Sequence, residues 1–153
     1  MDELDDEGTR SVVAIQRLQA AYADAVTCRD WAAVRLLFEP DAVVHIDTRT
    51  RDAFVLDGPD AVVEFIDGAI RRFTFFEFTI LNATCDVEGD EATGSVYLCE
   101  LRTDAEGEWS EAYGLYRDAY RRRGRTWRIA GRRYSSLARR GPDGTEAFTL
   151  PTE

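Results

Sequence analysis

The spacing of apolar and polar residues predicts three helices in the first half of the chain. In the first helix, apolar residues recur at helical spacing at Ile15, Leu18 and Tyr22. The second follows Asp30, a suitable N-cap, and the third follows Pro59, because proline is favoured in a first helical turn. The three predicted helices span residues 11–28, 31–38 and 60–70.

The pattern then changes to the two-residue alternation that is typical of strands. Two short strands are predicted around a polar turn, at 42–46 and 53–57. Four long strands follow at 73–89, 91–103, 109–122 and 126–137, joined by short turns rich in glycine and charged residues. Helices grouped before a strand meander indicate an α+β fold, with helices on one face of a curved antiparallel sheet.

The length of 153 residues fits one domain. We expect a flexible acidic N-terminus over 1–10, the α+β domain over 11–138, and a C-terminal tail over 139–153 that is poorly ordered from Gly141 onward. The sequence does not show the basic start and following apolar run that are typical of a signal peptide, so we expect none. No apolar run has the length of a membrane span. Three cysteines without a CxxC pair are typical of free thiols, so a cytoplasmic location is expected.

The formal net charge of −10 argues against nucleic acid or an anionic membrane as a partner. The charge is uneven, since ten of the 19 basic residues lie between Arg117 and Arg140, where Asp118 is the single acid. This arginine-rich run has no interleaved stacking aromatics on one face, which also disfavours nucleic acid. The single histidine, His45, and the absence of clustered ligands predict no metal site.

Four stretches resemble the SnoaL-like group of the nuclear transport factor 2-like superfamily. They are AIQRLQAAYADAVTCRDWAAVRLLFEPDAVV (14–44), LDGPDAVVEFI (56–66), LNATCDVEGDEA (81–92) and TWRIAG (126–131). The resemblance implies a cone in which the sheet wraps around a hydrophobic pocket plugged by the three N-terminal helices. Relatives such as scytalone dehydratase, ketosteroid isomerase and polyketide cyclases mostly remove or move a proton on a hydrophobic small molecule. One such fold hosts many activities, so the resemblance is weak for function.

Several of these relatives use an Asp–His dyad, and its two positions fall here on Thr27 and Phe78. Both members of the dyad are therefore absent. A shift of one residue in the alignment would replace Phe78 by Glu77, but Phe78 shares its strand face with Asn82, which keeps the place of a family asparagine. Other pocket positions of the family fall on Ile46, near Arg102 and near Tyr116.

Glu100 is the most informative carboxylate, because it lies in the middle of a strand and on the face expected to point inward. Burial would raise its pKa and let it work as a base near neutral pH. The alternative is a structural ion pair with Arg102, two residues further on the same face. Tyr116 could donate a hydrogen bond to a developing oxyanion or be a core tyrosine. Asn82 could orient a ligand or satisfy a backbone group.

These residues and the family resemblance lead to two alternative functions. The first is a cofactor-independent lyase, isomerase or cyclase acting on a hydrophobic small molecule. Its catalytic residues would be Glu100 and Tyr116, and its substrate-binding residues Thr27, Ile46, Phe78, Asn82 and Arg102. The alternative is a non-catalytic binding or dimeric assembly module, which the missing dyad favours. Under either function, we expect a homodimer through the outer sheet face, which alternation makes apolar at Phe75, Thr79, Leu81, Val87, Tyr97 and Leu101.

Overall fold

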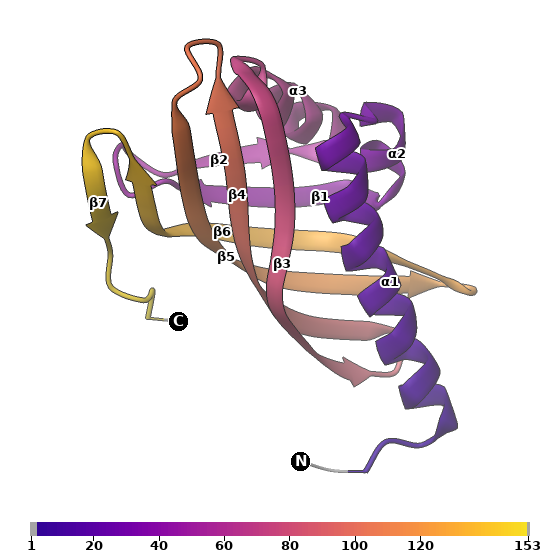
Figure 1. Cartoon of the computed structure of the whole chain (residues 1–153). Helices are drawn as coiled ribbons and strands as arrows, with labels where there is room; N and C mark the ends of the chain where they lie inside the picture. Colours follow the sequence, from indigo (N-terminus) through magenta and orange to yellow (C-terminus); the bar gives the residue numbers. More distant parts are fainter. Residues whose placement is uncertain (1–2, 153) are drawn as a thin grey trace.

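The computed structural model describes residues 3–152, and Figure 1 shows how their helices and strands are arranged. The helices are α1 (Asp6–Cys28), α2 (Trp31–Leu36) and α3 (Gly58–Ile70). The strands are β1 (Phe38–Asp47), β2 (Phe54–Asp57), β3 (Phe73–Glu88), β4 (Glu91–Asp104), β5 (Trp109–Arg123), β6 (Thr126–Gly141) and β7 (Gly144–Ala147). Each predicted helix and strand is therefore present, and β7 is an addition. Among the described helices, none is both long and apolar enough to cross a bilayer.

Helix α1 begins at Asp6, five residues before the predicted start. The side chain of Asp5 caps it by accepting a hydrogen bond from the backbone N–H of Gly8. Asp6 and Glu7 lie in the first turn, where negative charge is favourable near the positive end of the helix dipole. The expectation of a flexible segment up to residue 10 is wrong for residues 6–10, because these acids act as helix-starting residues.

The sheet has the strand order β2-β1-β6-β5-β4-β3, and β7 pairs with the end of β6. Strands β3 to β6 form the predicted antiparallel meander. Strand β1, in contrast, pairs in parallel with β6, with Val43 opposite Gly131. The sheet is therefore mixed rather than purely antiparallel.

The helices cover one side of this curved sheet. Helix α1 runs beside β3, and α2 and α3 lie together at one end (Figure 1). The apolar stripe of α1 packs through Ile15, Tyr22 and Val26 onto a core that includes Leu98 of β4 and Ile129 of β6. Burial of this stripe is the main stabilisation of such a helix.

A β-bulge at Leu81 changes which residues of β3 face the core. Ile80 lies opposite Leu98, but Asn82 lies opposite Tyr97, so Leu81 is the extra residue in the ladder. Since successive side chains alternate between faces, one extra residue swaps the faces of everything that follows. Val87, predicted on the outer face, accordingly packs against the core.

A second bulge lies in β6 at Ala130. Ile129 pairs with Tyr120 and Gly131 pairs with Ala119, which leaves Ala130 unmatched. Before the bulge the odd-numbered Ile129 is buried in the core, whereas after it the even-numbered Arg132 is buried.

The C-terminal region is more regular than predicted. Strand β6 continues to Gly141 and a turn leads into β7, in which Gly144 has a positive φ of 111° that favours glycine. Residues 144–147 then pair antiparallel with 138–141. The expectation of a poorly ordered tail from Gly141 onward is therefore wrong for Gly141 and residues 144–147.

Candidate functional site

A cavity of about 830 Å³ lies between the helices and the inner face of the sheet. Its volume is in the range of small-molecule sites. Helices α1 and α3 and strands β1 to β6 all contribute to its wall. Much of the lining is aromatic, from Tyr22, Phe38, Phe65, Phe73, Phe76, Phe78, Tyr116 and Tyr134.

A buried ion pair lies in the sheet beside the cavity. Arg132 donates from Nε to Oδ1 of Asp118 at 2.7 Å and from Nη2 to Oδ2 at 2.8 Å, so the pair is bidentate. The two side chains are 3% and 0% exposed. Tyr120 also donates to Asp118 and accepts a hydrogen bond from Gln19, which extends the network to α1. The remaining nitrogen of Arg132, Nη1, has no hydrogen-bond partner among the described residues.

Aromatic rings enclose the guanidinium of Arg132. Its Cζ lies 3.7 Å from the ring centroid of Tyr116 and 4.4 Å from that of Tyr22. These are cation–π contacts in a desolvated setting, where they are strongest. The phenol oxygens of Tyr22 and Tyr116 lie 3.3 Å apart, so either hydroxyl can donate to the other.

Burial keeps both phenols neutral at physiological pH. It raises the pKa of Tyr116 well above its ordinary value, and it also raises the pKa of Tyr22, although the positive charge of Arg132 opposes this. A neutral phenol is a hydrogen-bond donor. Because the pair uses one proton internally, the other proton remains free for a cavity ligand.

Glu100 lines the cavity from β4. Burial raises the pKa of its carboxyl group, while the positive charges of Arg102 and Arg139 lower it in part. Its Oε2 lies 3.5 Å from Nη1 of Arg102, a long contact at the limit of a hydrogen bond. Glu100 is therefore paired with Arg102, as one of the two sequence-based alternatives expected, and its pKa is still raised.

Tyr134 of β6 also lines the cavity, and its ring centroid lies 5.7 Å from that of Tyr116. A methyl group at Gly114 would collide with the Tyr134 ring, so the glycine is what allows the ring to lie against β5. The Tyr134 hydroxyl lies 3.1 Å from Oγ of Ser136, which also accepts a hydrogen bond from Arg139.

The structure brings five of the seven predicted site residues to the cavity. These are Ile46, Phe78, Glu100, Arg102 and Tyr116. Phe78 is buried and its ring stacks on that of Tyr116, with centroids 6.0 Å apart. Glu77 is exposed, so Phe78 is the inward residue of the two. His45 lies on the opposite sheet face, in a separate surface groove.

Asn82 and Thr27 do not line the cavity. Asn82 is exposed, because the bulge at Leu81 turns its side chain to the outer face, and the predicted inward orientation is wrong. The hydroxyl of Thr27 accepts a hydrogen bond from the backbone N–H of Phe78 at 3.0 Å. Thr27 thus joins α1 to the outermost strand of the sheet.

Replacing Thr27 by valine is expected to lower the free energy of unfolding by about 1 kcal/mol, because the N–H of Phe78 loses its acceptor. Ligand binding in the cavity should not change, since the side chain is not part of its wall. Urea denaturation and ligand titration of the same variant check the two statements. A large loss of affinity without loss of stability would contradict the anchoring role.

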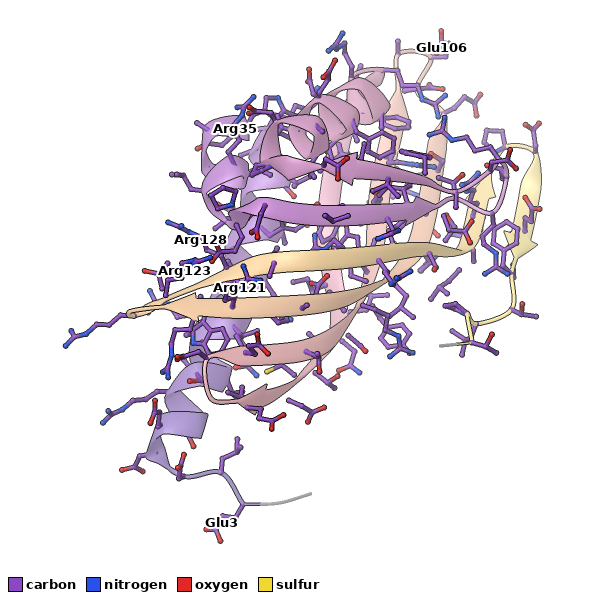
Figure 2. All side chains as sticks on the ribbon, turned by 180° about the vertical axis from the view of Figure 1, so that it is seen from behind. Glu3, Arg35, Glu106, Arg121, Arg123 and Arg128 are labelled. Carbon is purple, nitrogen blue, oxygen red and sulfur yellow. The ribbon has the colours of Figure 1, made fainter. Side chains whose placement is uncertain are left out.

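Sequence reasoning missed Arg132, Arg139 and Tyr134 as cavity residues. Arg132 and Tyr134 follow the bulge at Ala130, which reverses the alternation seen at Trp127 and Ile129, and Arg139 lies in the segment that was predicted to be a tail. One signal was available, since Asp118 is the single acid in an arginine-rich run. Arg121 and Arg123 of that run lie at the surface near the β5–β6 hairpin (Figure 2), which leaves a more distant arginine as the partner of Asp118.

Comparisons with solved structures find the same fold in several proteins. A candidate aromatic ring hydroxylase from Novosphingobium aromaticivorans is 26% identical, with 88% of this chain and 92% of that chain covered and a TM-score of 0.72. Rv3472 from Mycobacterium tuberculosis, of unknown function, is 26% identical over 81% and 74%, with a TM-score of 0.70. The hexachlorocyclohexane dehydrochlorinase LinA-type3 from Novosphingobium barchaimii is 18% identical over 91% and 94%, with a TM-score of 0.72.

No curated protein matches the chain. The model of the SnoaL-like domain family matches residues 8–133, which is most of the chain. This match agrees with the curved mixed sheet, the helices at the N-terminus and the solved structures of the same fold. The protein belongs to the SnoaL-like family of the nuclear transport factor 2-like superfamily.

Proposed function

We propose that this protein is a cofactor-independent enzyme of the lyase, isomerase or cyclase type that acts on a hydrophobic small molecule. The observation that carries the proposal is the carboxyl group of Glu100, which faces an aromatic cavity and has a raised pKa. A carboxylate in such a place accepts protons better than one in water, because burial penalises its charged form.

Glu100 takes a proton from a carbon acid of the substrate in this mechanism. The C–H bond breaks, its electron pair moves into the conjugated system, and negative charge develops on a substrate oxygen. The phenol pair of Tyr22 and Tyr116 donates a hydrogen bond to that oxygen, and the buried charge of Arg132 stabilises the resulting anion. Return of the proton at another atom gives isomerisation, and loss of a leaving group gives elimination.

The positions of the acidic and phenolic groups favour an extended substrate. Glu100 lies opposite Ala112, whereas Tyr116 lies opposite Val96, four residues before Glu100 in β4. At about 3.4 Å per residue, the backbones are about 14 Å apart along the sheet. The side chains shorten this distance. A conjugated ring system would delocalise the negative charge over the remaining distance, from the carbon that loses its proton to the oxygen near the phenols.

This chemistry differs from that of the relatives with an Asp–His dyad. Thr27 and Phe78 replace the dyad, and the Thr27 hydroxyl is engaged by the backbone of β3. Proton transfer therefore rests on Glu100, with Arg102 as the residue that positions its carboxylate.

The proposal is tested by incubating the protein in D₂O with a panel of cyclic and aryl ketones and following loss of the exchangeable C–H signals by NMR. Catalysed exchange that disappears in Glu100→Gln is the expected result. Exchange that persists at the wild-type rate in this variant would remove Glu100 from the mechanism. Binding of panel members without any exchange would instead favour the alternative, a binding module, which the missing dyad supports.

We also propose that the protein forms a homodimer through the outer face of the sheet. Phe75, Leu81 and Trp109 are 44%, 57% and 45% exposed. Phe75 and Trp109 stack on each other across Thr103 of β4, with ring centroids 5.9 Å apart, and form an apolar surface. Monomers seldom expose such contiguous patches.

Light scattering at micromolar concentration is expected to give a mass near twice the 17.3 kDa of one chain. Leu81→Arg should shift the mass toward the monomer, because it places a charge in the buried centre of the contact. Leu36→Arg is the matched control, since Leu36 is also exposed, at 70%, but lies on α2. A monomeric mass for the wild-type protein would contradict the dimer.

A further inference from the structure

The cavity wall carries more positive than negative charge, although the chain as a whole is strongly acidic. Five arginines and two glutamates line it: Arg51, Arg72, Arg102, Arg132, Arg139, Glu64 and Glu100. That is an excess of three positive charges. If Asp118 is counted against Arg132, the excess is still two, in a chain with a net charge of −10.

Arg72 and Arg102 gather on one aromatic ring. Their Cζ atoms lie 4.7 Å and 4.8 Å from the ring centroid of Phe73. Arg102 is further held by donating from Nε to Oγ of Ser110 at 3.1 Å. Two guanidinium groups on one ring form a site where cationic charge is concentrated rather than dispersed.

Arg139 adds a third positive charge from β6. It donates to the carbonyl oxygen of Thr48 at 2.9 Å and to Oγ of Ser136, both neutral acceptors. Among the described residues, neither Arg72 nor Arg139 has a carboxylate within ion-pair distance, and Arg102 has only the long contact to Glu100. The carboxylates of this region therefore do not balance its arginines.

The arginines also affect one another electrostatically. Burial lowers the pKa of Arg102, and although Glu100 opposes this, the positive charges of Arg72 and Arg139 lower it further. Like charges brought together in a partly desolvated place are unfavourable unless an anion joins them. Arginine in turn suits oxyanions, because its planar fork donates two parallel hydrogen bonds.

We propose that the ligand of this cavity is an amphipathic anion, whose ring system lies among the aromatic side chains and whose oxyanion group, such as a carboxylate, is bound by Arg72, Arg102 and Arg139. The inference rests on the proposed function in that both concern the same cavity. It adds a requirement that the enzymatic proposal does not contain, namely a negative charge on the substrate near Glu100. It also assigns specificity to Arg72 and Arg139, which have no role in the proposed proton transfer.

Two fluorescent dyes with the same ring system test this proposal. 1-Anilinonaphthalene-8-sulfonate carries an oxyanion group, and N-phenyl-1-naphthylamine is its uncharged counterpart. Both brighten in an apolar site, so one titration format serves for both. We expect the anionic dye to bind at least about tenfold more tightly, because a hydrogen bond to a charged group contributes on the order of a tenfold change in affinity or more.

Arg72→Met and Arg139→Met should each raise the Kd of the anionic dye about tenfold and leave that of the neutral dye unchanged. Methionine keeps the apolar stem of arginine, and neither change strands a buried carboxylate. Arg72 is exposed, so its variant is expected to fold even if Arg139→Met does not. Arg121→Met is the control, because Arg121 lies outside the cavity near the β5–β6 hairpin (Figure 2).

Equal affinity for the two dyes, or equal response of both dyes to the arginine variants, would overturn the anion site but leave the cavity and the enzymatic proposal standing. Failure of both dyes to bind would overturn the two proposals together. Competition by 1-naphthoate, 1-naphthalenesulfonate and 1-naphthyl phosphate then identifies the preferred oxyanion group. Weaker competition by 1-naphthamide is the result expected for a true anion site.

Discussion

Replacing Arg132 by methionine is expected to lower the free energy of unfolding by about 3–5 kcal/mol, the cost of leaving one member of a buried ion pair without its partner. Asp118 would keep its carboxylate in the protein interior with only the hydroxyl of Tyr120 as a donor. The cation–π contacts with Tyr22 and Tyr116 would be lost as well. Urea denaturation followed by circular dichroism measures the change.

Two further variants make this prediction specific to the buried pair. Arg132→Met combined with Asp118→Asn should recover part of the loss, since no unpaired charge then remains in the interior. Arg35→Met is the surface control, because its ion pair with Asp60 is exposed (Figure 2) and such pairs contribute about 0–1 kcal/mol. A loss below about 1 kcal/mol in the single Arg132 variant would mean that the pair is not structurally important.

Replacing Glu100 by glutamine is expected to lower the rate of catalysed proton exchange by at least about 100-fold, the usual size of a general-base contribution. Glutamine has the same shape and can still contact Arg102, so the fold should be retained. In the wild-type protein, the rate should fall as the pH falls through the raised pKa of Glu100, because only the carboxylate accepts a proton. This inflection should lie above the usual range of a glutamate and be absent from any residual rate of the variant.

Glu100 is also expected to make wild-type stability depend on pH, in the opposite sense to an ordinary salt-bridged acid. Because the folded pKa of Glu100 is raised, the folded state binds its proton more tightly than the unfolded state does. Wild-type stability is therefore unaffected by this group below its unfolded pKa and declines as the pH rises toward the folded pKa. Glu100→Gln should gain stability relative to wild type from pH 4 to pH 8, by about 1.4 kcal/mol for each unit of the shift. A constant difference would exclude the raised pKa.

The sequence predicted the order of helices and strands because that order depends on local spacing, which each segment carries within itself. The facing of Glu100 and Tyr116 was also predictable, since β4 and β5 pair without a register shift. Phe78 was placed on the correct face, although the bulge at Leu81 separates it from Asn82, the residue used to orient it. Asn82 was placed on the wrong face because a single extra residue, Leu81, reverses alternation and leaves no composition signal. The same geometry at Ala130 hid Arg132 and Tyr134.

Pairwise partners across strands were not predictable either. Arg132 meets Asp118 through the register of β5 and β6, and Thr27 meets the backbone of Phe78 through the docking of α1. Both depend on where whole elements come together. The resemblance to the family predicted the cavity. The charged residues within it, however, come together only through the pairing of strands in the folded protein.

The parallel pairing of β1 with β6 has a consequence for the order in which the protein folds. Val43 must find Gly131, so the contact closes a loop that contains α3 and most of the meander. Contacts of such large sequence separation form late, because the entropy of loop closure is lost before they contribute. On a ribosome, α1 and β1 emerge long before their partner strand exists. The arginines that β6 brings to the cavity therefore arrive last, and a chain interrupted before β6 would lack one wall of the binding site and the charges of Arg132 and Arg139.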